Sequence, residues 1–92
     1  MKWTELPKLN KFVTEKMKSE YPYQEKDGDV IFSLPDGLFM RIFSMSGEHF
    51  NCLGMEYGET PDLLPDDGDL YYVGDYSTPE KLFDAMLEET KR

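Results

Sequence analysis

The stretch EKDGDVIFSLPDGLFMRIFSM, residues 25–45, contains two turn signals, each followed by an apolar extended segment. The Asp-Gly pair at 27–28 is typical of a two-residue β-hairpin turn, in which both central residues adopt positive φ. The Pro-Asp-Gly triplet at 35–37 predicts a second turn. Residues 30–34 and 38–45 are rich in the aromatic and large apolar side chains that strands favour. Strands joined by turns this short are antiparallel, so the stretch predicts a β-meander.

Further strands are expected on both sides of this region. Residues 23–26 precede the first turn as a short strand, and 49–55 follow as a longer one. An extended pattern resumes at residues 70–73. Between the last two lies an acidic segment in which Pro61 and Pro65 disfavour both helix and central strand, so we expect a loop there.

A helix is expected at each end of the chain. Near the N-terminus, apolar residues recur at steps of three and four, with Thr4 as a cap and the Tyr-Pro pair at 21–22 beyond the helix end. They are Leu6, Leu9, Val13 and Met17. Near the C-terminus either Ser77, or Thr78 followed by Pro79, can cap a second amphipathic helix. Its apolar face consists of Leu82, Phe83, Met86 and Leu87.

These elements predict an α+β fold in the order α-β-β-β-β-β-α. We expect an antiparallel β-meander of four or five strands, flanked by an N-terminal and a C-terminal helix that both pack on one face of the sheet. A chain of 92 residues is long enough to close one hydrophobic core, so residues 1–92 are expected to form a single domain. The second face of the sheet is then left partly aromatic and partly wet.

The net charge of −9 constrains the partners. Residues 58–79 alone carry six acids and no lysine or arginine. A field of this sign repels nucleic acid phosphate and anionic membranes, so we expect neither as a direct partner. The single Cys52 cannot form an internal disulfide, and no apolar run approaches the ~20 residues of a membrane span, so a cytoplasmic protein is expected.

The sequence offers no constellation for catalysis. His49 and Cys52 would lie on opposite faces of one strand, so they are poorly placed to act together, and we expect Cys52 to pack in the core. The glycines are distributed about one per turn, unlike a phosphate-binding loop. We therefore expect no enzymatic activity, no catalytic residues, no metal site and no cofactor.

A weak calcium site is an alternative to that expectation. Asp66, Asp67 and Asp69, with Asp62 or Asp75, could supply several oxygen ligands from a flexible turn. The spacing does not match an EF-hand loop, and the competing interpretation is a solvated turn.

The favoured hypothesis is a small acidic protein-binding module, an inhibitor or adaptor. Carboxylates interleaved with tyrosines complement a basic partner surface such as the channel of a nucleic-acid-binding enzyme. Bacterial immunity proteins and phage anti-defence proteins share this size and acidity, an analogy of type only. The other alternative is a homo-oligomer, such as a homodimer, that associates through Phe39, Phe43 and Phe50 or an edge strand. The residues expected to bind the partner are Glu59, Asp62, Asp66, Asp67, Asp69, Tyr71, Asp75 and Tyr76.

Overall fold

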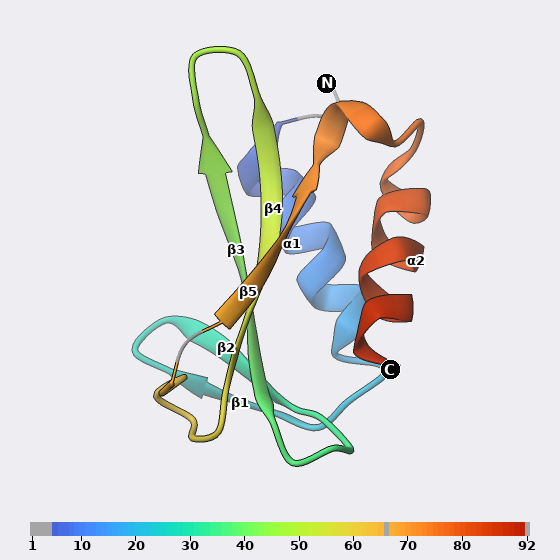
Figure 1. Cartoon of the computed structure of the whole chain (residues 1–92). Helices are drawn as coiled ribbons and strands as arrows, with labels where there is room; N and C mark the ends of the chain where they lie inside the picture. The colour runs from blue at the N-terminus through green and yellow to red at the C-terminus, as the bar shows by residue number, and fades with distance from the viewer. Residues whose placement is uncertain (1–4, 66, 92) are drawn as a thin grey trace.

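The computed structural model describes residues 5–65 and 67–91 and contains two α-helices and a five-stranded antiparallel sheet (Figure 1). The strands follow one another across the sheet in chain order, β1-β2-β3-β4-β5. The predicted α+β meander is thereby confirmed. The elements are α1 (Leu6–Met17), β1 (Tyr23–Lys26), β2 (Asp29–Ser33), β3 (Phe39–Ser46), β4 (Asn51–Gly58), β5 (Asp67–Tyr72), the short 3-10 helix η1 (Val73–Asp75) and α2 (Pro79–Thr90).

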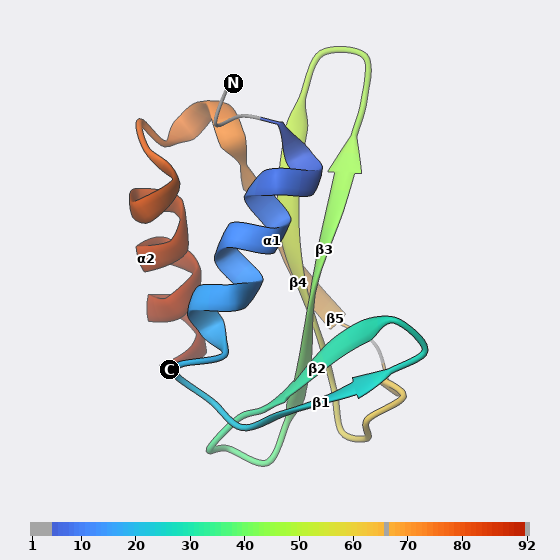
Figure 2. The same ribbon diagram turned by 180° about the vertical axis from the view of Figure 1, so that it is seen from behind.

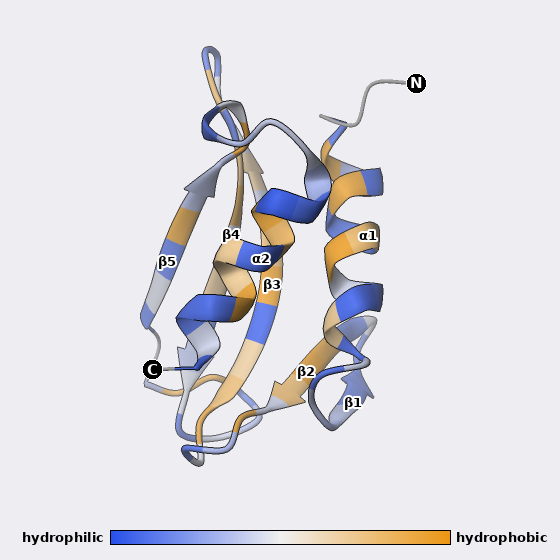
Figure 3. Ribbon diagram, turned by 90° about the vertical axis from the view of Figure 1, so that its right-hand side faces the viewer, coloured by the Kyte–Doolittle hydropathy of each residue, from blue (hydrophilic) through white to orange (hydrophobic). Residues whose placement is uncertain are grey.

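Both helices cover the same face of the sheet, as Figures 1 and 2 show from opposite sides. Each turns its apolar stripe towards the strands (Figure 3), and the buried apolar residues of the two helices join those of the sheet in one cluster. This is the arrangement expected of amphipathic helices on a sheet. The fully buried members of the cluster are Leu9, Val13, Met17, Phe32, Met40, Leu53, Met55, Leu82 and Met86. The opposite side of the sheet, which no helix covers, is called the open face below.

The predicted turns form for the expected reason. Asp27 has φ 53° and Gly28 has φ 85°, so both central residues of the β1–β2 turn are left-handed. At the β2–β3 turn Gly37 has φ 91°, and a carboxylate oxygen of Asp36 accepts a hydrogen bond from the backbone N–H of Leu38 at 3.0 Å. These local preferences fix the register of the first three strands.

The last two strands differ from the prediction. β4 runs from Asn51 to Gly58, three residues beyond the end of the strand predicted over residues 49–55, and β5 begins at Asp67 inside the segment predicted to be a loop. That prediction is wrong for residues 67–69, because the backbone of Asp67 to Asp69 pairs with Tyr57 to Met55 of β4. The backbone pairing between β4 and β5 outweighs the low strand propensity of an Asp-Gly-Asp sequence.

The structure identifies the N-cap of α2 but does not test the cap predicted for α1. Thr78 caps α2, since its Oγ1 accepts from the backbone N–H of Lys81 at 3.1 Å, with Pro79 as the first helical residue. Thr4 lies outside the described residues, and the N-cap position of α1 is Glu5. Neither helix is long or apolar enough to cross a membrane within the described ranges.

The β4–β5 loop, residues 59–65, covers one part of the open face. Ile31 and Leu63 are buried there, with 4% and 8% of their surface exposed, and both line one small hollow. Gly58 lies directly beneath the loop, because a Cβ built on it would collide with the backbone of Leu63. The absence of a side chain at Gly58 is therefore what allows the loop to fold back.

Candidate functional site

The predicted partner-binding residues do not form one surface. Glu59 and Asp67 line one pocket, whereas Asp75 lines a separate hollow near the β3–β4 hairpin tip. Asp62 forms an ion pair with Lys26 beside the open face. The others are Asp69 and Tyr71 on β5, Tyr76 after η1, and Asp66, which lies outside the described residues.

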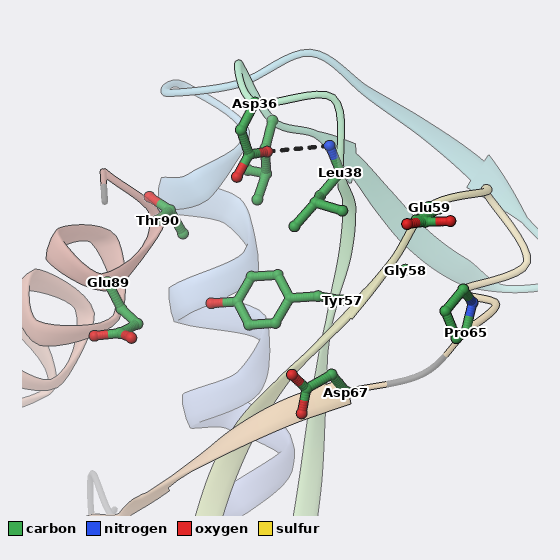
Figure 4. Close-up of a pocket in the computed structure, with 10 residues that line it drawn as sticks. Asp36, Leu38, Tyr57, Gly58, Glu59, Pro65, Asp67, Glu89 and Thr90 are labelled. Carbon is green, nitrogen blue, oxygen red and sulfur yellow. Dashed lines mark hydrogen bonds between the residues drawn. The ribbon is translucent and has the colours of Figure 1, made fainter.

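The pocket that contains Glu59 and Asp67 lies between the β2–β3 turn, the β4–β5 loop and the C-terminal turn of α2 (Figure 4). Its volume is about 430 Å³. Four carboxylates line it, each from a different segment, and they are the only charged groups among its described lining residues. They are Asp36, Glu59, Asp67 and Glu89; we call this set the acidic pocket.

Apolar side chains form the floor of the acidic pocket. The ring of Tyr57 lies among the labelled residues of Figure 4 with its hydroxyl directed towards α2, and only 8% of the residue is exposed. Its hydroxyl donates to Sδ of Met55 at 3.7 Å. Leu34, Leu38 and Pro65 complete the apolar lining. The pocket thus combines an apolar floor with an anionic rim.

The backbone orients two of the four carboxylates. Asp36 accepts from the N–H of Leu38, and Oδ1 of Asp67 accepts from the N–H of Gly68 at 2.8 Å. Since each carboxylate has two oxygens and several acceptor positions, such a bond leaves further acceptor capacity. Both side chains are therefore held in place and can still accept from a ligand.

The electrostatics of this end of the molecule favour a cation. The last turn of α2 carries the negative end of the helix dipole and contains no basic residue, and Lys91 follows it at the C-cap. Burial raises the pKa of the nearby Tyr71 phenol above its ordinary value. Tyr57, Glu89 and Asp69 raise this pKa further, because they disfavour the negative charge of the Tyr71 phenolate. Of these groups, the carboxylates of Glu89 and Asp69 would attract a bound positive charge, whereas burial disfavours a charge of either sign.

Sequence reasoning missed Asp36 and Glu89. From the sequence, Asp36 is only part of a predicted turn, and Glu89 has no assigned role. The two approach Glu59 and Asp67 only because α2 and the β2–β3 turn meet at one end of the sheet. A signal that could have drawn attention to Glu89 is its place in a last helical turn, where cations rather than anions are favoured.

The remaining candidates weighed from the sequence are His49, Cys52 and the aspartates of the alternative calcium site. Cys52 is fully buried and donates to the carbonyl oxygen of Met45 at 3.5 Å, and burial raises the pKa of its thiol. The side chain of His49 is 90% exposed at the hairpin tip, beside Glu48 at 4.0 Å. Across residues 5–65 and 67–91, no three histidine, cysteine or acidic side chains are placed to hold a metal ion.

No family model matches the chain, and comparison with curated proteins and with solved structures gives no match either.

Proposed function

We propose that this protein is a small acidic protein-binding module, an inhibitor or adaptor that docks on a basic surface of a partner protein. One observation supports this most: the acidic pocket brings four carboxylates from four segments around an apolar floor. A lysine or arginine side chain has a matching form, with an apolar stem and a cationic head. Carboxylates bind such heads by charge-assisted hydrogen bonds, which are stronger than neutral ones.

The size of the pocket fits one or two such side chains rather than an extended polymer. A volume of about 430 Å³ lies at the lower end of ligand pockets, which hold roughly 300–1,000 Å³. The remaining acids on β5 and its flanks, including Asp69 and Asp75, would then attract the partner over a longer range without contacting it. A nucleic-acid-binding enzyme is one class of partner that presents a surface of this kind.

The test is capture of partners from a lysate of the native host, at low and at moderate salt. In the pocket variant, Asp36→Asn, Glu59→Gln and Asp67→Asn are combined, since the amides keep the shape and the acceptor oxygen. The control variant removes as many charges from exposed acids elsewhere, through Glu20→Gln, Glu48→Gln and Asp84→Asn.

The proposal expects a basic protein that the wild type retains at low salt and releases at moderate salt. The control variant should retain most of it, and the pocket variant should lose at least ~90%, since loss of a few charge-assisted bonds exceeds a tenfold effect. Equal retention by both variants would show that net charge, not the pocket, attracts the partner. Capture of no basic protein at either salt would reject the proposed function.

A further inference from the structure

β5 is an edge strand of the sheet. The strand order puts β1 and β5 at the two margins, and Figure 3 shows β5 along one side of the sheet, beyond β4. An edge strand directs backbone N–H and C=O groups outwards, and these groups form a template for one further strand. β5 is six residues long, whereas β1 has four. The edge at β5 therefore offers more backbone groups to a partner.

The register identifies which backbone groups of β5 point outwards. At the β3–β4 hairpin tip the N–H of Gly47 donates to the carbonyl oxygen of Phe50 at 2.9 Å, so the backbone groups of Phe50 point to β3. Backbone groups of successive strand residues point to alternate sides, so even-numbered residues of β4 bond to β3 and odd-numbered ones to β5. The odd-numbered residues of β4 pair with the odd-numbered residues of β5. Gly68, Leu70 and Tyr72 therefore direct their N–H and C=O groups away from β4.

The side chains of β5 differ in chemistry between the two faces of the sheet. Leu70 and Tyr72 lie on the open face and are 42% and 46% exposed. Asp67 and Asp69 lie on the face that the helices cover, together with Tyr71, which packs against the core. Since cross-strand neighbours share a face, an added strand would place alternate side chains beside the apolar pair and beside the two acids.

The surroundings of β5 are acidic on both faces. Three hollows border the strand, and no lysine or arginine is among their described lining residues. Their acids are Asp36, Glu48, Glu56, Glu59, Asp67, Asp75 and Glu89. Arg41, with a nitrogen 2.5 Å from Glu56, offsets the charge of that one acid. A basic strand is attracted by this field, whereas β5 of a second copy would bring further acids to it.

From these observations we propose that β5 binds an extended segment of a partner protein as an additional strand of the sheet, and that this segment alternates basic and apolar residues. Backbone hydrogen bonds supply the affinity of such a contact, and the alternating side chains supply its specificity. The basic residues lie beside Asp67 and Asp69, and the apolar residues beside Leu70 and Tyr72. This inference deepens the proposed function and rests on it, because Asp67 also lines the acidic pocket.

Binding of a synthetic peptide tests the proposal. The probe is a fluorescein-labelled peptide of about eight residues in which lysine and valine alternate, and its fluorescence anisotropy is followed at low salt with up to about 1 mM wild-type protein. A peptide of the same composition with all lysines in one block should bind at least ~10-fold more weakly. It cannot place its basic and apolar side chains on separate faces of a strand.

Backbone methylation separates strand addition from general charge attraction. One peptide carries an N-methyl group on every valine and another carries it on every lysine, so the two have the same charge and composition. An antiparallel strand bonds to Leu70 and Tyr72 through the N–H groups of valine, and a parallel strand through those of lysine. One methylated peptide should therefore bind at least ~10-fold more weakly than the other. Equal affinities would overturn the proposal.

Leu70→Pro tests the same contact from the side of the protein. Proline is tolerated at an edge position whose N–H faces away from the sheet, and it removes that donor. Leu70→Ala is the matched control, because it removes most of the same side chain and keeps the N–H. The proline variant should bind the alternating peptide at least ~10-fold more weakly than the alanine variant. Circular dichroism verifies folding, and the methylated peptides decide the question with wild-type protein if the proline variant does not fold.

The outcomes distinguish this inference from the proposed function. No binding of the alternating peptide up to about 1 mM, or equal affinities of the proline and alanine variants, would overturn strand addition and leave the acidic pocket to the lysate capture. Capture of no basic protein from the lysate would reject the proposed function, whatever the synthetic peptide does. Self-association of the free chain that Leu70→Pro abolishes would assign the β5 edge to a second copy and would also overturn the proposal.

Discussion

Replacing Gly58 with alanine is expected to destabilise the protein strongly through one steric conflict. The added Cβ would collide with the backbone of Leu63, which cannot rotate away as a side chain could. Either the strand and loop shift while remaining packed, which costs ~1–3 kcal/mol for overpacking, or the loop lifts off. In the second case Leu63 and Ile31, which are 8% and 4% exposed, become accessible to water. Exposing one such side chain costs ~1.5–3 kcal/mol.

Lifting the loop exposes two such side chains at a cost of ~3–6 kcal/mol, so the shift is the cheaper route and sets the expected loss in the free energy of unfolding at about 1–3 kcal/mol. At ~4–8 °C per kcal/mol for a domain of this size, that corresponds to a decrease in Tm of about 4–24 °C. Urea and thermal unfolding followed by circular dichroism measure both quantities. Gly74→Ala is the control, because a Cβ on Gly74 has no neighbour within 4 Å. A loss below about 0.5 kcal/mol for Gly58→Ala, the range of unremarkable surface changes, would refute the placement of the loop.

Two further substitutions test the helix cap and the half-buried phenol of Tyr71. Thr78→Ala should lower the free energy of unfolding in urea by about 1 kcal/mol, because it removes the acceptor for the N–H of Lys81. Ser77→Ala should leave this free energy nearly unchanged. A larger loss for Ser77→Ala than for Thr78→Ala would show that Ser77 is the cap. Because burial raises the pKa of Tyr71, the folded state holds the phenolic proton more tightly than the unfolded chain does. Its contribution to stability is therefore fully present below about pH 10, the ordinary tyrosine value, and declines above it. Tyr71→Phe should flatten the decline in urea-unfolding free energy above that pH, and an unaltered pH dependence would contradict the assigned burial.

The first three strands could be predicted because their information is local. The Asp27-Gly28 turn fixes a hairpin by backbone conformation alone, and Gly37 does the same for the next turn. The two helices follow from apolar periodicity, and Thr78 with Pro79 is one of two caps that the sequence allows. Each of these signals spans a few residues, so tertiary context does not alter it.

The start of β5 and the acidic pocket could not be predicted for a common reason. Asp67 to Asp69 have low strand propensity. They form a strand because they pair with β4, and no local sequence signal predicts that pairing. Asp36 and Glu89 come together only when α2 packs on the sheet. Counting acids along the chain therefore gives the sign of the charge but does not identify which acids lie close together in the fold.

Zero-length cross-linking tests the proposed docking of a basic partner most directly. A carbodiimide joins a carboxylate to an amine only where the two are in contact, and mass spectrometry of the captured complex then identifies which acids are joined to partner lysines. The proposed function predicts that these bonds concentrate on Asp36, Glu59, Asp67 and Glu89. Cross-links confined to helix-surface acids such as Glu15 and Asp84, with none at the acidic pocket, would contradict it.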